Sequence, residues 1–138
     1  MEYYFVNKEE LVAEDSSLSL GWFKINKVEI VENTYCILTI SLSDLINGLV
    51  SLNDKKNNFF RWCPCDSGEV LLLEKKNNEV VIKYKEKEII KSFKSLYEEV
   101  LELGSNLLIE LEKKRKESVL EAAFIDLNRT IREAGSLP

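Results

Sequence analysis

Two cysteines separated by one proline have the spacing that most directly suggests chemistry. Cys63-Pro64-Cys65 is followed by Asp66, and Cys36 is the third cysteine of the chain. Two thiolates and a carboxylate could hold a soft metal ion, but structural zinc takes four ligands, usually with wider cysteine spacing. A redox dithiol would more typically show C-x-x-C spacing. Because the ligand count falls short, we expect a turn cysteine beside a strand-end cysteine, with no metal site and no cofactor.

Histidine is absent from the 138 residues. This absence excludes catalysis by Ser-His-Asp or Cys-His groups and removes the most common metal-binding side chain. The sequence also contains no glycine-rich phosphate loop, no H-E-x-x-H, no G-x-S-x-G and no EF-hand pattern. These features favour a protein that is not an enzyme. A small enzyme that uses carboxylate or cysteine chemistry is the alternative.

Three glutamates, Glu98, Glu99 and Glu102, cluster on the polar face of a predicted helix. Paired catalytic carboxylates need a concave apolar site that moves their pKa values apart. The polar face of an amphipathic helix does not provide such a site and is usually solvated. If these glutamates have a role, we expect them to attract a basic partner.

The overall charge bears on the kind of partner. The net charge is −5, which disfavours nonspecific nucleic-acid binding and suits a basic protein. The basic run Lys113–Lys116 could contact phosphates. It also ends the long predicted helix, where cations interact favourably with the last carbonyl groups. We therefore expect no nucleic-acid partner.

Aromatic side chains are more numerous than one sheet face needs. Aromatic residues anchor many protein interfaces, although most of them are buried in a core. We name Phe60 and Trp62, in one predicted strand, as anchor candidates. The full aromatic set is Tyr3, Tyr4, Trp22, Phe59, Phe60 and Trp62.

Length and composition indicate one globular domain covering residues 1–138, with 45% hydrophobic and 31% charged residues. No apolar stretch reaches the ~18 residues that a membrane-spanning helix needs, so we expect no membrane partner. Residues 1–6 lack the basic region of a signal peptide. Three cysteines do not make a disulfide framework and fit a reducing compartment. We expect a cytoplasmic protein.

The clearest structural pattern is a hairpin over residues 69–84. Asn77-Asn78 is the predicted turn, because asparagine tolerates a positive φ. This turn places Leu73 opposite Ile82 and Leu71 opposite Tyr84 on one dry face. With a strand at 58–63, the hairpin forms a predicted three-stranded meander.

The N-terminal part is predicted as a strand over 2–6 and a hairpin over 22–42. The hairpin turn is placed at Glu32-Asn33-Thr34. The pairing register of its strands is left undecided, because apolar residues occupy both odd and even positions. A short helix follows, opening at Ser41–Asp44, with Ser43 as the rival cap.

Two helices are predicted near the C-terminus. The first covers 88–112, where Gly104 falls within the apolar stripe and indicates close packing rather than a break. The second follows a capping box at Ser118–Glu121 and ends near Gly135. Strands followed by helices predict an α+β fold: an antiparallel sheet of about five to six strands with two C-terminal helices on one face.

The order of these elements resembles small bacterial immunity proteins, which neutralise toxins of interbacterial competition systems. The resemblance covers about residues 22–111, in the order hairpin 23–42, short helix 43–50, meander ending at 79–84, and helix 92–100. It implies a cytoplasmic, non-catalytic and often acidic protein that binds one toxin domain tightly.

We therefore expect a non-catalytic protein-binding module that blocks a basic toxin domain, as a monomer or a homodimer. Acidic groups would steer the partner, and aromatic anchors would lie at the centre of the contact. A homodimeric ligand-binding or structural domain is a further alternative. The expected partner-binding residues are Glu98, Glu99, Glu102, Phe60 and Trp62.

Overall fold

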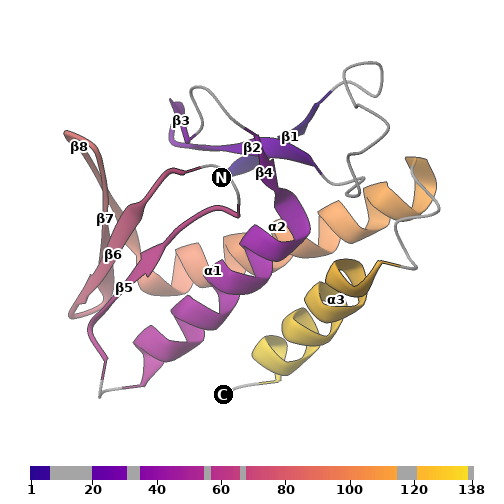
Figure 1. Ribbon diagram of the computed structural model, residues 1–138. Coiled ribbons are helices and arrows are strands. Elements are labelled where there is room, and N and C mark those ends of the chain that lie inside the picture. Colours follow the sequence, from indigo (N-terminus) through magenta and orange to yellow (C-terminus); the bar gives the residue numbers. More distant parts are fainter. Residues whose placement is uncertain (7–19, 31–34, 55–56, 66–67, 115–120, 137–138) are drawn as a thin grey trace.

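The computed structural model describes residues 1–6, 20–30, 35–54, 57–65, 68–114 and 121–136. Within these ranges the chain forms eight strands and three helices (Figure 1). The strands are β1 Glu2–Phe5, β2 Leu20–Ile25, β3 Val28–Glu29, β4 Cys36–Ile37, β5 Phe59–Trp62, β6 Leu71–Lys76, β7 Glu79–Tyr84 and β8 Lys87–Ser92. The helices are α1 Leu38–Asn53, α2 Phe93–Lys114 and α3 Ala122–Gly135.

The strands form two antiparallel sheets of four strands each. In the first sheet, β2 pairs with β1, β3 and β4, and in the second sheet the order is β5-β6-β7-β8. The α+β class with antiparallel pairing is therefore confirmed. The prediction of a single sheet of five to six strands was wrong. The strands form two sheets, because α1 separates β4 from β5 in the chain.

The predicted hairpin is confirmed in the second sheet. Leu73 lies opposite Ile82, and Asn77 takes a φ of 58° in the turn. A fourth strand, β8, occupies residues predicted as the start of a helix. Ile89 is buried and Ile90 is exposed, which is strand alternation. Two adjacent isoleucines fit the helical and the strand period equally well, and the structure places them in a strand that precedes the helix.

The hairpin in the first sheet turns earlier than predicted. Asn26 and Lys27 both have positive φ, 47° and 70°, which suits the right-handed twist of a tight hairpin. The turn predicted at residues 32–34 lies outside the described residues. The strand predicted to reach Leu42 ends at Ile37, where α1 begins.

Helix α1 is longer than predicted and lies at the centre of the fold. Its buried leucines recur every three or four residues, which is the spacing of one helical face. Ile37 rather than a serine is the cap, and Ser41 Oγ instead donates to the Ile37 carbonyl oxygen at 2.7 Å. The buried leucines are Leu38, Leu42, Leu45, Leu49 and Leu52.

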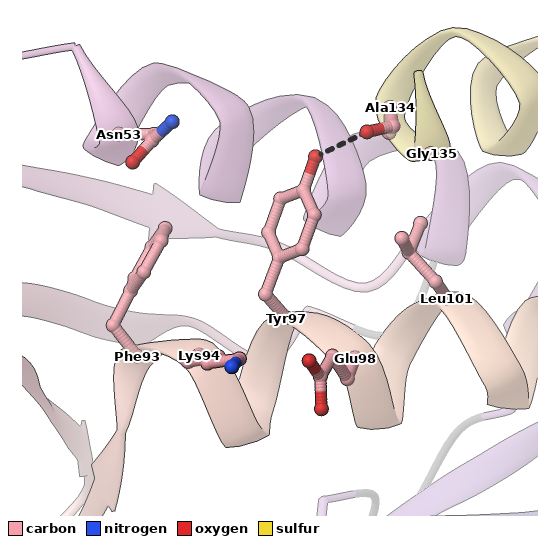
Figure 2. A pocket seen from close by; sticks show the side chains of 8 residues that line it. All are labelled: Asn53, Phe93, Lys94, Tyr97, Glu98, Leu101, Ala134 and Gly135. Carbon is pink, nitrogen blue, oxygen red and sulfur yellow. Dashed lines mark hydrogen bonds between the residues drawn. The ribbon is translucent and has the colours of Figure 1, made fainter. Parts of the chain in front are cut away.

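The two C-terminal helices occupy different places. Helix α2 packs against β7 and β8, whereas α3 packs on α1 and α2. The predicted close packing at Gly104 is confirmed, because a Cβ there would lie 2.8 Å from Ile131 Cδ1. The Tyr97 hydroxyl donates to the Ala134 carbonyl oxygen at 2.8 Å, which ties α2 to the end of α3 (Figure 2). The capping box predicted before α3 falls mostly on residues 115–120, outside the described residues.

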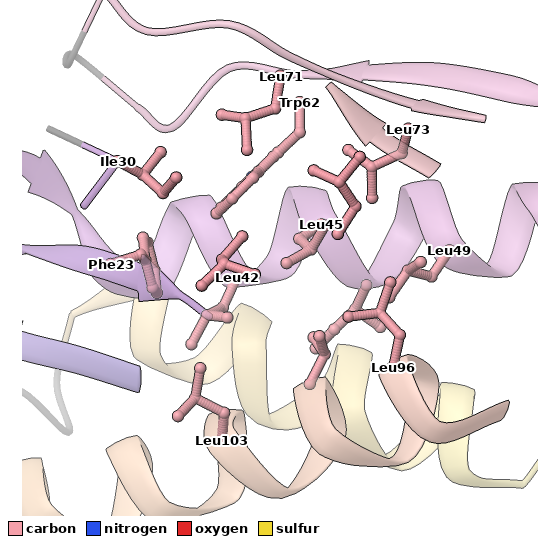
Figure 3. Packing of buried hydrophobic residues seen from close by; sticks show 14 of the residues in the cluster. Phe23, Ile30, Leu42, Leu45, Leu49, Trp62, Leu71, Leu73, Leu96 and Leu103 are labelled. Atoms are coloured by element: carbon pink, nitrogen blue, oxygen red, sulfur yellow. The ribbon is translucent and has the colours of Figure 1, made fainter. Parts of the chain in front are cut away.

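One hydrophobic core joins the two sheets through α1 (Figure 3). Trp62 of β5 lies against Phe23 of β2, with ring centroids 5.3 Å apart. The Trp62 indole N–H donates to the Ser41 carbonyl oxygen at 2.8 Å. In the described part of the chain, the inner face of each sheet is thus committed to packing.

Candidate partner-binding surface

Three aromatic side chains lie next to one another on the outer face of the first sheet. We call Tyr4, Trp22 and Tyr35 the aromatic row. Tyr4 lies opposite Trp22 in the β1–β2 register, with rings stacked at 5.3 Å and 21°. The Trp22 and Tyr35 rings follow at 5.8 Å and 36°. The row therefore crosses three neighbouring segments of one sheet.

Strand alternation directs these rings outward. In β2, Phe23 and Ile25 are buried on the inner face. Trp22 and Lys24 alternate with them along the strand and therefore belong to the outer face. Gly21 also points inward, where an added Cβ would collide with the Tyr4 carbonyl oxygen. The absence of a side chain at Gly21 thus permits the close approach of β1 to β2 next to the Tyr4–Trp22 pair.

The aromatic row is accessible to solvent. Tyr4 is 36% exposed and Tyr35 is 43% exposed, with Trp22 half-buried between them. Aromatic rings held on a rigid sheet present a large contact area with little conformational freedom left to lose. This is the arrangement that a protein interface uses for its anchors.

Charged side chains border the aromatic row on one side. Glu2, Lys24 and Glu29 lie opposite one another across β1, β2 and β3. The Tyr4 hydroxyl donates to the Glu2 carboxylate, and this hydrogen bond raises the pKa of Tyr4. The border carries two acidic groups and one basic group, so the surface combines an apolar centre with a mainly acidic rim.

The predicted acidic helix face is only partly available to a partner. Glu98 and Glu102 are exposed on α2. Glu99 is instead partly buried, and it accepts hydrogen bonds from the Met1 ammonium group and from Lys91 Nζ, the latter at 2.6 Å. We therefore reassign Glu99 to holding the N-terminal strand and β8 against α2.

The predicted aromatic anchors in β5 do not lie at the surface as expected. Trp62 is 1% exposed and belongs to the core. Phe60 is half-buried, and its ring lies over Gly48 of α1, where an added Cβ would meet it. The parity of β5 turns the other aromatic, Phe59, to solvent. Trp62 is thus corrected from an interface anchor to a core residue.

Sequence reasoning missed Tyr35 and did not group it with Tyr4 and Trp22. The available signal was the Asn26-Lys27 pair, since a hairpin turning there places Trp22 outside and Phe23 inside. Tyr35 joins the aromatic row because β4, the strand that follows it, pairs with β2, and this pairing joins segments that are distant in sequence. No local pattern around Tyr35 predicts it.

None of the three cysteines, all of which lie in the described ranges, is part of a disulfide; Cys36 is buried, Cys63 exposed and Cys65 half-buried. Within the described ranges no group of three Cys, Asp or Glu side chains could hold a metal ion, and Asp66 lies outside those ranges. In the basic run, Lys114 Nζ pairs with Glu110 of α2 at 3.0 Å.

A groove of about 450 Å³ lies between the end of α1, the start of α2 and the end of α3 (Figure 2). Phe93, Tyr97 and Leu101 supply apolar lining, while Lys94 and Glu98 stand on α2 beside them. Burial raises the pKa of Tyr97, whose hydroxyl is already bonded to Ala134. Among the described residues that line the groove, Glu98 is the one carboxylate, and acid–base hydrolysis uses a pair.

The ion pairs of Glu99 lead to a stability prediction. Glu99→Gln is expected to lower the free energy of unfolding by about 1–2 kcal/mol, because two cationic groups lose their partly buried partner. Glu98→Gln, one residue away and exposed, is the matched control and should change stability by less than about 0.5 kcal/mol. Urea unfolding followed by circular dichroism measures both. Equal losses in the two variants would contradict the structural role of Glu99.

No helix in the described part of the chain is long and apolar enough to cross a bilayer. No protein-family model, no curated protein and no solved structure matches the chain.

Proposed function

We propose that the protein is a non-catalytic binding module whose protein partner covers the aromatic row. The observation that supports this most strongly is the set of adjoining rings of Tyr4, Trp22 and Tyr35 on a sheet face that the core does not use. The few residues that dominate an interface are enriched in Trp and Tyr, and truncating one of them costs about 2 kcal/mol or more. A rigid row of three supplies residues of this kind.

The charge distribution supports a basic partner. Glu2 and Glu29 border the aromatic row, and Glu98 and Glu102 add exposed negative charge on α2. The whole chain carries a net charge of −5. A basic surface would be attracted over a distance of about one Debye length, which raises the association rate. The apolar row would then provide most of the affinity.

The more specific proposal is that the partner is a toxin domain and that binding neutralises it. The resemblance to small immunity proteins and the acidic composition support this role. Neutralisation by covering a toxin requires a stable complementary surface and no catalytic group on the inhibitor. The second sheet and the helices would then serve to hold the first sheet rigid.

Two linked experiments test these proposals. The immobilised chain is used to capture protein from its native host, and the captured protein is identified by mass spectrometry and repurified. We expect a direct complex between the two purified proteins and rescue of growth when the chain is produced together with the captured protein. A captured protein that is harmless to cells would refute the toxin role alone. Turnover by the purified chain that is lost on changing one carboxylate or thiol would refute the non-catalytic module.

A further inference from the structure

Two of the three cysteines meet where β4 and α1 approach the segment after β5. The Ile37 N–H donates to the Cys65 carbonyl oxygen at 3.1 Å. The backbone bonds on either side of this hydrogen bond limit the separation of the Cys36 and Cys65 Cα atoms to about 8 Å at most. Disulfides join Cα atoms that are usually about 4.4–6.8 Å apart, so the backbone already brings this pair to bonding range or close to it.

Ser41 lies between the two segments that carry these cysteines. The Cys65 N–H donates to Ser41 Oγ at 2.8 Å, and the same hydroxyl donates to the carbonyl oxygen of Ile37, the residue after Cys36, at 2.7 Å. The backbone segments that carry Cys36 and Cys65 are therefore joined twice, once directly and once through the Ser41 hydroxyl group.

Access to the two thiols differs. Cys36 is 1% exposed, and burial raises the pKa of its thiol to about 11. Cys65 is half-buried and can be reached from solvent, as can the exposed Cys63. A small oxidant would therefore react first at Cys65 or Cys63, and Cys36 would react only with a sulfur that is already beside it.

We propose that Cys36 and Cys65 form a modification site that closes to an intramolecular disulfide on reaction with a small-molecule disulfide. The Cys65 thiolate attacks one sulfur of the small disulfide, giving a mixed disulfide and releasing one small thiolate. Cys36 then loses its proton and attacks the Cys65 sulfur, which releases the second small thiol. Two protein thiols are oxidised to one disulfide, and one small disulfide is reduced to two thiols.

Closure would clamp the end of the aromatic row. Tyr35 directly precedes Cys36, and Cys65 follows β5 by three residues, so the bond would tie the first sheet to the second. Cross-linking a loop of this length should raise Tm by about 5–10 °C through the loss of unfolded-state entropy. Tyr35 would then be held both by its ring contact with Trp22 of β2 and by the covalent bond at the next residue.

The test treats the full chain with oxidised glutathione, blocks remaining thiols with an alkylating reagent, and measures the intact mass and linked peptides. We expect linked peptides containing residues 36 and 65, Cys63 either alkylated or carrying one glutathione, and a Tm rise reversed by dithiothreitol. Cys63→Ser should leave closure unchanged, whereas Cys65→Ser should abolish it. Because Cys65 is not fully buried, Cys65→Ser is expected to fold even if Cys36→Ser does not.

Two other results would overturn the proposal. A link between Cys63 and Cys65, with Cys36 alkylated after unfolding, would show that Cys36 does not take part. Stable glutathione adducts on Cys65, with no internal bond after prolonged incubation, would show that the Cys36 sulfur cannot reach its neighbour. In either case the aromatic row and its proposed partner would be unaffected.

Discussion

Replacing Trp22 and Tyr35 together with alanine is expected to weaken partner binding by at least about 100-fold. Each truncation removes an aromatic ring that the partner would desolvate, and central aromatic anchors commonly contribute 2 kcal/mol or more. Since 1.4 kcal/mol is a tenfold change, a 100-fold loss is a conservative expectation for two such residues. Calorimetric or surface-based titration of the purified partner measures the change.

The loss should arise from the interface rather than from unfolding. Tyr35 is 43% exposed and Trp22 is half-buried, so their truncation removes ring stacking and limited burial. A stacked aromatic pair is worth about 0.5–1.5 kcal/mol beyond its buried area. The variant is therefore expected to fold, with a circular dichroism spectrum like that of the unsubstituted chain.

The matched control lies on the outer face of the second sheet. Phe59 and Ile90 are 55% and 57% exposed, so Phe59→Ala with Ile90→Ala removes a comparable amount of exposed apolar side chain. This control should bind the partner with unchanged affinity. Loss of binding in the control, with affinity retained in the Trp22 and Tyr35 variant, would move the binding surface to the second sheet.

Replacing Trp62 with alanine is expected to lower the free energy of unfolding by about 3–5 kcal/mol, because a large buried side chain leaves a cavity. The same change leaves the Ser41 carbonyl oxygen without its indole donor and removes the contact with Phe23. A domain of this size has about 5–15 kcal/mol of stability in total. Chemical unfolding followed by tryptophan-independent circular dichroism gives the change.

Trp62→Phe separates the two contributions of this residue. Phenylalanine keeps a ring in the core but cannot donate to Ser41, so we expect a smaller loss, about 1–3 kcal/mol. At temperatures where it is folded, this variant should bind the partner as the unsubstituted chain does. Unchanged stability together with weaker partner binding would instead return Trp62 to the interface.

The elements that local patterns predicted well are those that the chain determines within a few residues. The hairpin at Asn77-Asn78 follows from turn chemistry and from apolar alternation on both sides of the turn. The continuity of α2 through Gly104 follows from an apolar period that the glycine does not interrupt. Both features depend on residues close in sequence, and both are confirmed.

The elements that were predicted wrongly depend on distant contacts. Residues 38–42 contain β-branched and aliphatic side chains suited to a strand, but burial of Leu38 and Leu42 against both sheets makes them the first turns of α1. In β8, pairing with β7 outweighs a helical spacing that Ile89 and Ile90 also satisfy. Tertiary packing decided between two local patterns in each case.

The candidate site shows the same division. Exposure of Glu98 and Glu102 followed from helical periodicity. The ion pair between Glu99 and the N-terminus could be predicted only by knowing that the N-terminal strand lies beside α2. The burial of Trp62 could be predicted only by knowing which face of β5 packs on the core. The aromatic row unites side chains from positions 4, 22 and 35 through strand pairing, which is the reason that no single stretch of sequence contains it.

Hydrogen–deuterium exchange of the chain, with and without its purified partner, tests the binding surface most directly. We expect added protection in β1, β2 and residues 35–37, and unchanged exchange in β5 and β8. Protection confined to the second sheet or to the α1–α2–α3 groove would contradict the assignment of binding to the outer face of the first sheet.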